Sequence, residues 1–176
     1  MKKVVALVMS MVMLLSVAAL ADTGLRMEPK AGGPSVTGGI SVLRVTVDGK
    51  AVETAPVAVA AEPSQLVKDL TAAIGEAGMA GAFGSALENA AEYELFALQD
   101  FSADSVNADM VVDLAVPGIT ADVEVVALLG LVVDGNVEWA NVEVVSVGDG
   151  VLSIALTEEL VAASQGVDAV IAILVK

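Results

Sequence analysis

The chain has 176 residues, with 23 Asp and Glu against 8 Lys and Arg, and it contains neither His nor Cys. Without Cys there can be no disulfide framework, thiolate nucleophile or Cys-ligated metal, and without His there is no usual catalytic triad. The formal net charge of −15 argues against a nucleic-acid partner, because phosphate binding requires clustered Lys and Arg.

Residues 1–21 have the three-part pattern of a secretory signal peptide. Lys2 and Lys3 precede an apolar-rich run over residues 4–20, and Ala19-Leu20-Ala21 places small residues where a signal peptidase cuts. The alternative is an uncleaved anchor, although this run is at the lower limit for crossing a hydrocarbon core of about 30 Å. We therefore expect a secreted, extracellular protein that meets a membrane only through this segment, if it stays uncleaved.

Residues 22–39 are rich in glycine and proline and lack hydrophobic periodicity, which predicts a flexible linker. A single domain is then expected over residues 40–176. A chain of about 150 residues can bury roughly 68–70% of its unfolded surface, so this domain needs no disulfide to hold a core.

The domain is expected to begin with a strand over residues 40–47. Leu43, Val45 and Val47 alternate with polar residues there and are predicted to share the buried face. The following Asp48-Gly49 pair is typical of a tight hairpin turn.

A helical insert is predicted at residues 63–91. Pro63 suits the first helical position, because its missing N–H has no partner there anyway. The four glycines between Gly75 and Gly84, each costing about 1 kcal/mol relative to Ala, are expected to break the helix. Ser85 and Glu88 have the spacing of a capping box that restarts it. The apolar stripe of the first part comprises Leu66, Val67, Leu70, Ala73 and Ile74.

From residue 93 onward the pattern of apolar runs and turn residues predicts strands separated by turns, with one short helix between Thr157 and Gly166. Strands at this spacing favour an antiparallel β-sandwich, Ig-like or jelly-roll-like, and a barrel is the alternative. The last predicted strand is apolar on both faces. The predicted strands are residues 93–98, 110–116, 123–129, 137–147 (with a bulge at Asn141), 151–156 and 169–175.

Four segments of the second half carry a resemblance to a known type of module. They are Val126–Gly130, Asp134–Trp139, the Gly148–Ile154 hairpin and the closing Ala169–Leu174. Their order resembles the β-sandwich module of uncharacterised secreted and cell-surface proteins of Gram-positive, mostly clostridial, bacteria. The resemblance implies a bacterial surface module and brings no known activity with it.

Calcium is the metal that acidic oxygens bind without help from His or Cys. The most oxygen-rich segment is residues 100–109, so Asp100, Asp104 and Asp109 are the candidate ligands of a calcium site. The segment lacks the alternating acidic pattern of an EF-hand loop. We expect no other cofactor.

Two carboxylates alone can hydrolyse a glycosidic bond if they face each other across a cleft at about 5–10 Å. Sugar clefts also use stacked aromatic rings, and this chain has one Trp, one Tyr and three Phe. We expect Trp139 to fill a core rather than to stack on a ligand. The acid pairs therefore predict a solvated surface and no enzyme. These pairs are Asp100 with Asp104, Asp109 with Asp113, Glu158 with Glu159, and Glu92 with Glu94.

The sequence as a whole favours a secreted, non-catalytic structural or protein-interaction module of the bacterial cell envelope. Its partner would be a protein at the cell surface that the sequence does not identify. A calcium- or ligand-binding β-sandwich module is the alternative.

Overall fold

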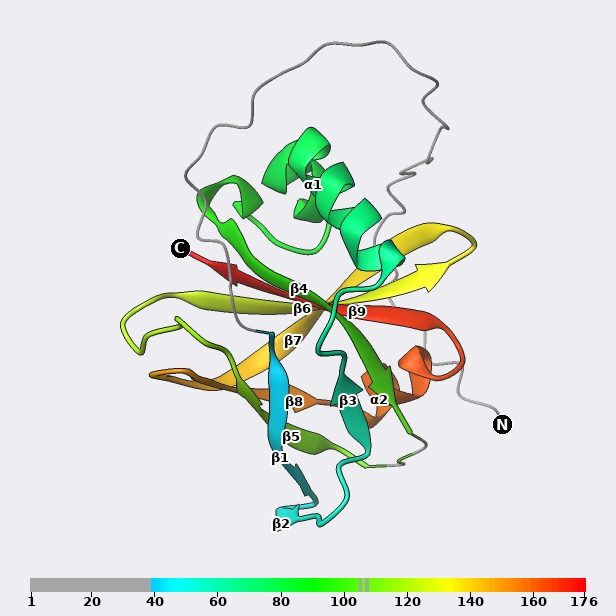
Figure 1. The fold of residues 1–176 in the computed structure, drawn as a ribbon, viewed down its shortest axis with the longest axis vertical. Coiled ribbons are helices and arrows are strands. Elements are labelled where there is room, and N and C mark those ends of the chain that lie inside the picture. Colours follow the sequence, from blue (N-terminus) through cyan, green and yellow to red (C-terminus); the bar gives the residue numbers. More distant parts are fainter. Residues whose placement is uncertain (1–38, 105, 107) are drawn as a thin grey trace, which may run out of the picture.

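The computed structural model describes residues 39–104, 106 and 108–176, which fold around one nine-stranded sheet (Figure 1). The strand order is β2-β1-β5-β8-β7-β6-β9-β4-β3, and every neighbouring pair is antiparallel. The predicted signal peptide and all but the last residue of the predicted linker lie outside the described residues. The elements are β1 (Ser41–Val47), β2 (Lys50–Ala51), β3 (Val57–Val59), α1 (Gln65–Phe83), a 3-10 helix (Ala90–Glu92), β4 (Glu94–Ala103), β5 (Met110–Ala115), β6 (Val125–Val133), β7 (Asn136–Gly148), β8 (Val151–Leu156), α2 (Glu158–Ser164) and β9 (Asp168–Val175).

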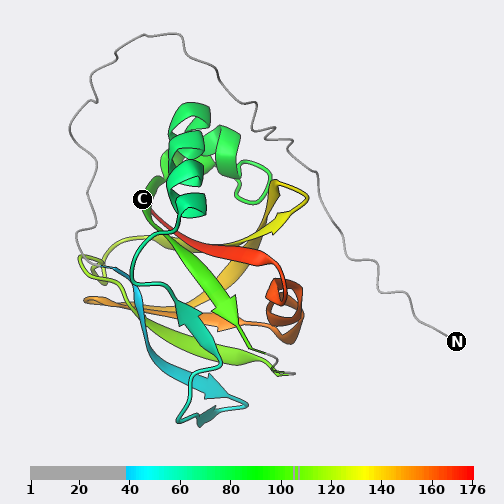
Figure 2. The same cartoon turned by 45° about the vertical axis from the view of Figure 1, so that its right-hand side comes forward.

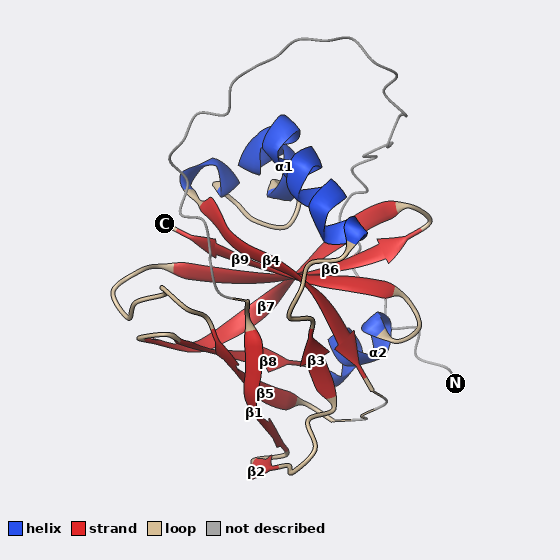
Figure 3. Cartoon of the chain, viewed as in Figure 1, coloured by secondary structure: helices blue, strands red, loops and turns tan. Residues whose placement is uncertain are grey.

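The sheet curls into a half-barrel because β7 belongs to both of its halves (Figure 3). The first part of β7, up to Val142, pairs with β6, and the part from Glu143 onward pairs with β8. The register shifts between Val144 and Ser146, and such an irregularity bends a strand and increases its twist. The prediction of a mainly antiparallel β fold is confirmed. The two packed sheets of an Ig-like or jelly-roll-like sandwich are not confirmed, since all nine strands are linked by hydrogen bonds.

The predicted Asp-Gly hairpin turn at residues 48–49 is confirmed, and the Asp-Gly pair at residues 134–135 forms the same kind of turn. Asp48 and Gly49 both have positive φ, at 48° and 75°, and Asp134 and Gly135 have φ of 51° and 78°. Positive φ at both central residues is the conformation of a type I′ turn, whose twist matches that of the flanking strands. These turns join β1 to β2 and β6 to β7.

Two apolar cores lie on opposite faces of the sheet. The first fills the inside of the half-barrel, and the second lies between the outer face of β4, β9 and β6 and the helix α1 (Figures 1 and 2). Strand β9 serves both, which explains why it is apolar on both faces. Its Ala169, Ile171 and Ile173 belong to the inner core, and its Val170, Ala172 and Leu174 lie beneath α1.

Helix α1 runs from Gln65 to Phe83, through most of the glycine-rich segment that was expected to break it. The expected break appears at one residue, Gly78, whose φ of 71° and ψ of 165° kink the helix. The predicted restart at Ser85 is wrong: turns follow α1, and then a 3-10 helix over Ala90–Glu92. Tertiary contacts explain the persistence of α1, because its apolar face covers the sheet on both sides of the kink.

Strand β1 departs from the predicted alternation. Val45 is buried, but Leu43 is 57% exposed, so the two do not share the buried face. The register of β1 against β5 shifts between Val42 and Arg44, and this bulge rotates the Leu43 side chain toward solvent. Among the described residues, no helix combines the length and apolar character needed to cross a membrane.

The pKa of Tyr93, the residue just before β4, can be tested by titration. Its hydroxyl donates a hydrogen bond to Glu124, and that bond, together with burial, raises the pKa of Tyr93 above its ordinary value of 10.0. Since the raised pKa favours the neutral phenol, its contribution to stability is present below pH 10 and is lost as the pH rises through the folded-state pKa.

We expect the ultraviolet titration of the folded protein to show a single phenol ionising above pH 10, because Tyr93 is the only tyrosine. The variant Glu124→Gln should move this midpoint down toward 10. A midpoint at or below 10 in the unmodified protein would contradict the hydrogen bond to Glu124.

Candidate binding groove

A groove of about 390 Å³ lies between the first half of α1 and the first half of β4. Its volume is within the range of sites that bind small ligands. Most of its lining is apolar, and among the lining residues Lys68 alone carries a charge. The lining residues are Pro63, Val67, Lys68 and Thr71 on the helix side, and Leu95, Phe96, Ala97, Leu98 and Gln99 on β4.

The α1 wall is held against β4 by a capping arrangement at Ser64. Its Oγ accepts a hydrogen bond from the N–H of Val67, which fixes the start of the helix. Ser64 also donates from its backbone N–H and from Oγ to the Asp100 carboxylate, at 2.9 and 2.6 Å. Because Asp100 is part of β4, these bonds tie the helix start to the strand that forms the opposite wall.

The groove follows an open edge of the sheet. Strand β3 pairs only with Phe101–Ala103 of β4, and the last bond along this side joins the Ala60 N–H to the Asp100 carbonyl, at 3.1 Å. Backbone groups of an antiparallel strand alternate in direction, so Leu98, two residues before Asp100, also directs its N–H and C=O toward this side. No described strand pairs there, and these groups are available to another chain.

Gln99 contributes a polar group that the fold leaves unsatisfied. It lines the groove, and its Oε1 is buried with no hydrogen-bond partner among the described residues. A buried acceptor without a donor costs about 1–3 kcal/mol, so native structures rarely retain one without a reason. Gln99 pairs with Ile171 of the inner core, so its side chain lies on the face of β4 opposite to Leu98 and Asp100, which face α1.

The hydroxyl of Thr71, which also lines the groove, already forms a hydrogen bond within α1. The Thr71 hydroxyl donates to the Val67 carbonyl at 2.7 Å, one turn earlier. Thr71 is exposed and faces the groove, whereas the neighbouring Ala72 is exposed without lining it. A side chain at position 71 therefore reaches the groove and one at position 72 does not, although both positions are exposed to solvent.

The structure does not bring the predicted calcium ligands together. Asp100 accepts the bonds from Ser64, and Asp109 accepts a 2.9 Å bond from the backbone N–H of Glu158 at the start of α2. Asp104 is exposed, and its N–H donates to the Pro56 carbonyl at 2.7 Å. Within the described ranges, no three acidic side chains are grouped so that they could hold a metal ion.

Members of the other acid pairs also have structural partners. Asp113 accepts bonds from Arg44 and Ser153 across three neighbouring strands, at 2.8 and 2.7 Å. Glu92 forms an ion pair with Lys176. These carboxylates hold strands and chain segments in place.

Trp139 packs in a core, as expected, but between sheet and helix rather than between two sheets. Its ring centroid lies 4.8 Å from that of Phe83 on α1, with the planes tilted by 57°. The residue opposite it on β6 is Gly130, where a Cβ atom would lie 2.6 Å from the indole ring. The glycine therefore provides the room that the indole occupies.

Sequence reasoning missed the groove residues. Lys68 had no distinguishing neighbour in the sequence, and the only signal at Gln99 was a polar residue between the apolar Leu98 and Phe101 of a strand. A scan against protein-family models and searches of curated proteins and of solved structures found no match. The functional argument therefore rests on this geometry.

Proposed function

We propose that this chain is an exported, non-catalytic protein-interaction module that binds an extended segment of another protein in the groove between α1 and β4. The observation that carries the proposal is the open edge of β4 at Leu98, which runs beside an apolar helix face. A peptide that adds as a strand to a sheet edge gains affinity from main-chain hydrogen bonds, and pockets for alternate side chains give specificity.

The groove has the components that such binding requires. Leu98 offers a backbone donor and an acceptor along the edge, and Val67 and Pro63 offer apolar contacts from the helix side. Side chains of an added strand alternate between the two faces, so every second one would point toward α1.

Two features support export, and a third supports the absence of catalysis. Residues 1–21 have the pattern of a signal peptide, and residues 126–174 resemble modules of bacterial surface proteins, which favours the cell envelope. The carboxylates with the best-defined contacts, Asp100, Asp109 and Asp113, are used as hydrogen-bond acceptors for backbone and side chains of the fold itself.

A neutral strand-forming peptide tests the proposal. The probe is the acetylated and amidated peptide Ser-Val-Thr-Val-Thr-Val-Ser, and the measurements are calorimetric titration and amide hydrogen exchange. We expect binding to slow exchange at the Leu98 amide, because a new main-chain bond protects it. The same peptide with N-methyl groups on alternate residues should not bind, since it lacks the donors.

A pair of variants locates the binding site. Thr71→Trp should weaken binding of the peptide at least tenfold by filling the groove, and Ala72→Trp should leave the affinity unchanged. Both positions are exposed on α1, so both variants should fold. The proposal fails if the peptide does not bind, if the N-methylated peptide binds equally well, or if the two variants behave alike.

A further inference from the structure

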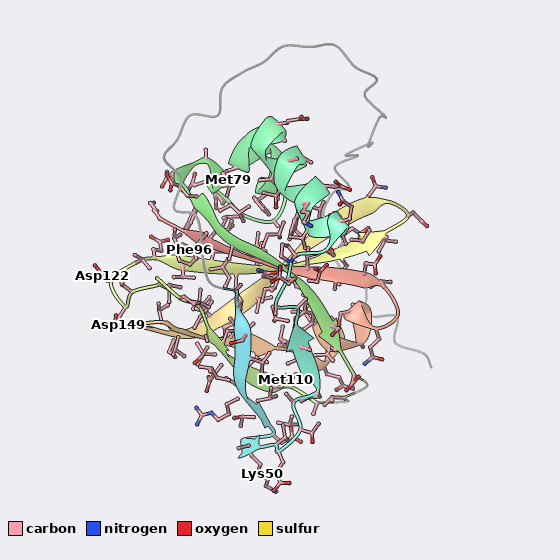
Figure 4. All side chains as sticks on the ribbon, in the orientation of Figure 1. Lys50, Met79, Phe96, Met110, Asp122 and Asp149 are labelled. Atoms are coloured by element: carbon pink, nitrogen blue, oxygen red, sulfur yellow. The ribbon has the colours of Figure 1, made fainter. Side chains whose placement is uncertain are left out.

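The outer face of β1, β5, β8 and the second part of β7 carries no helix in the described part of the chain. Helix α1 covers β4, β9 and β6, and α2 contributes Val161 to the inner core. In Figure 4, Lys50 of β2 and Asp149 of the β7–β8 turn mark the two ends of this face along the strands, and Met79 of α1 lies apart from both. The outward side chains are all exposed or half-buried. They are Ser41, Leu43, Arg44, Thr46, Val111, Asp113, Ala115, Glu143, Val145, Ser146, Val151, Ser153 and Ala155.

Two bulges place a large apolar side chain at each edge of this face. Leu43 on β1 is 57% exposed and Val145 on β7 is 52% exposed, the two highest values among the large apolar side chains of the described residues. Each is the extra residue of a register shift, and a bulge re-aims the side chain that it carries. Both lie within one residue of the same row across the strands, the row of Asp113 and Ser153. Exposed apolar groups that gather on one face mark an interaction surface.

The charges of this face are compensated at its centre and complementary at its edges. Asp113, on β5, accepts bonds from Ser153 and from Arg44 at 2.7 and 2.8 Å. Arg44 uses Nε and one Nη on the same carboxylate oxygen, so its second Nη has no partner among the described residues, and its side chain is 65% exposed. Glu143 is exposed on β7, at the opposite edge. One edge therefore offers a cation and the other an anion.

From these observations we propose that this face binds a second copy of the chain, face to face, about a two-fold axis that runs parallel to the strands between β5 and β8. Such an axis lays β1 of each copy over β7 of the other. Leu43 then meets Val145 of the second copy. Arg44 lies two residues along the strand from Glu143 of the second copy, which their long side chains span. An axis perpendicular to the strands would instead oppose Arg44 to Arg44, so the charges select the first arrangement.

The middle of the face suits this packing. Its two central strands present small side chains, including Ala115, Ala155 and Ser153, so a second sheet can approach to about 10 Å. The carboxylate of Asp113 keeps both of its hydrogen-bonded partners when it is covered, so no unpaired charge is buried.

The size of the face sets the strength of the dimer. Four strands and five rows of residues give it about 19 Å by about 17 Å, which even with the relief of its side chains falls short of the about 800 Å² per partner of a stable interface. The formal net charge of −15 also opposes self-association. We therefore expect a weak dimer, with a Kd on the order of 100 µM. The groove belongs to the other half of the sheet, so this dimer does not depend on the proposed function.

Sedimentation equilibrium of the exported chain between about 5 and about 500 µM, at about 150 mM salt, tests the association. The average mass should rise from monomer toward dimer. Val145→Asp should raise the Kd at least tenfold, because it puts an acid against Leu43 and beside Glu143. The matched control is Val133→Asp on β6, whose valine is 39% exposed and outside the face, and it should leave the Kd unchanged.

Cross-linking tests the direction of the axis. The chain contains no Cys, so an introduced pair reports one contact. Within one molecule, β5 and β8 separate positions 43 and 145 by about 14 Å, and a disulfide needs Cα atoms within about 7 Å. Under mild oxidation, a mixture of Leu43→Cys and Val145→Cys chains should give a covalent dimer with one copy of each. Leu43→Cys alone, and Leu43→Cys mixed with Val133→Cys, should cross-link far more slowly.

Each contrary result overturns a stated part of the proposal. A monomer at every concentration overturns the dimer. Equal effects of Val145→Asp and Val133→Asp overturn the assignment to this face. Cross-linking of Leu43→Cys with itself, as fast as with Val145→Cys, overturns the parallel axis. Peptide binding in the groove is measured separately and is expected to be the same in Val145→Asp as in the unmodified chain.

Discussion

Replacing Phe83 with Ala should lower the free energy of unfolding by about 3–5 kcal/mol, the range for removing a buried aromatic ring. Phe83 is fully buried at the end of α1 and contacts Trp139, with ring centroids 4.8 Å apart. Its removal leaves a cavity between the helix and the outer face of the sheet. Urea unfolding followed by circular dichroism measures the loss, and the Trp139 fluorescence should change with it.

The matched control is Leu43→Ala, which removes a large apolar side chain that is 57% exposed. Its effect should stay within about 0.5 kcal/mol, because little apolar surface and no cavity are involved. Equal unfolding midpoints for the two variants would show that α1 does not rest on Phe83. Because Phe83 fixes the far end of α1, and α1 forms one wall of the groove, Phe83→Ala should also weaken binding of the peptide Ser-Val-Thr-Val-Thr-Val-Ser.

Gly130→Ala should be the most destabilising of the single-methyl additions in the sheet, by about 1–3 kcal/mol. The added Cβ would lie 2.6 Å from Cζ3 of Trp139 and 2.9 Å from Cγ1 of Val137, both of which belong to the neighbouring strand β7. Real Cβ atoms do not approach so closely, so the indole must move away from Phe83. Thermal and urea unfolding measure the cost.

Two comparisons separate this steric effect from the general cost of a substitution in the sheet. Gly148→Ala, at the end of β7, places its Cβ 3.8 Å from the nearest atom and should be tolerated. In a Trp139→Leu background, Gly130→Ala should cost less than in the unmodified chain, because the clash with the indole is gone. Additive effects of the two substitutions would contradict the proposed contact.

The fold could be predicted from the sequence wherever the pattern reflects burial. The two apolar faces of residues 169–175 correctly indicated a strand covered on both sides, and the Asp-Gly pairs gave the hairpins. The glycine-rich part of α1 was predicted in part: the helix breaks at Gly78, and it continues on both sides of the break because its apolar face contacts the sheet. The single sheet was missed because nothing local shows that β7 pairs with different strands along its length.

The candidate site could not be predicted for a similar reason. The open edge exists because β3 ends at Val59, before it covers Leu98, and that depends on the pairing of distant segments. Asp100 looked like a calcium ligand in the sequence, and the structure gives it a hydrogen-bonding role with Ser64, 36 residues earlier. Oxygen-rich sequences do not reveal which donors the fold will bring to them.

The position of β9 has a consequence for the time at which the chain can fold. This strand lies between β6 and β4 and supplies residues to both cores, yet it is made after both of them. Until β9 has been synthesised, β6 and β4 have no strand between them to pair with. The face of the sheet against which α1 packs is also incomplete. Most native contacts then join distant segments, which slows folding. The complete sheet can therefore form only after nearly the whole described chain has been made.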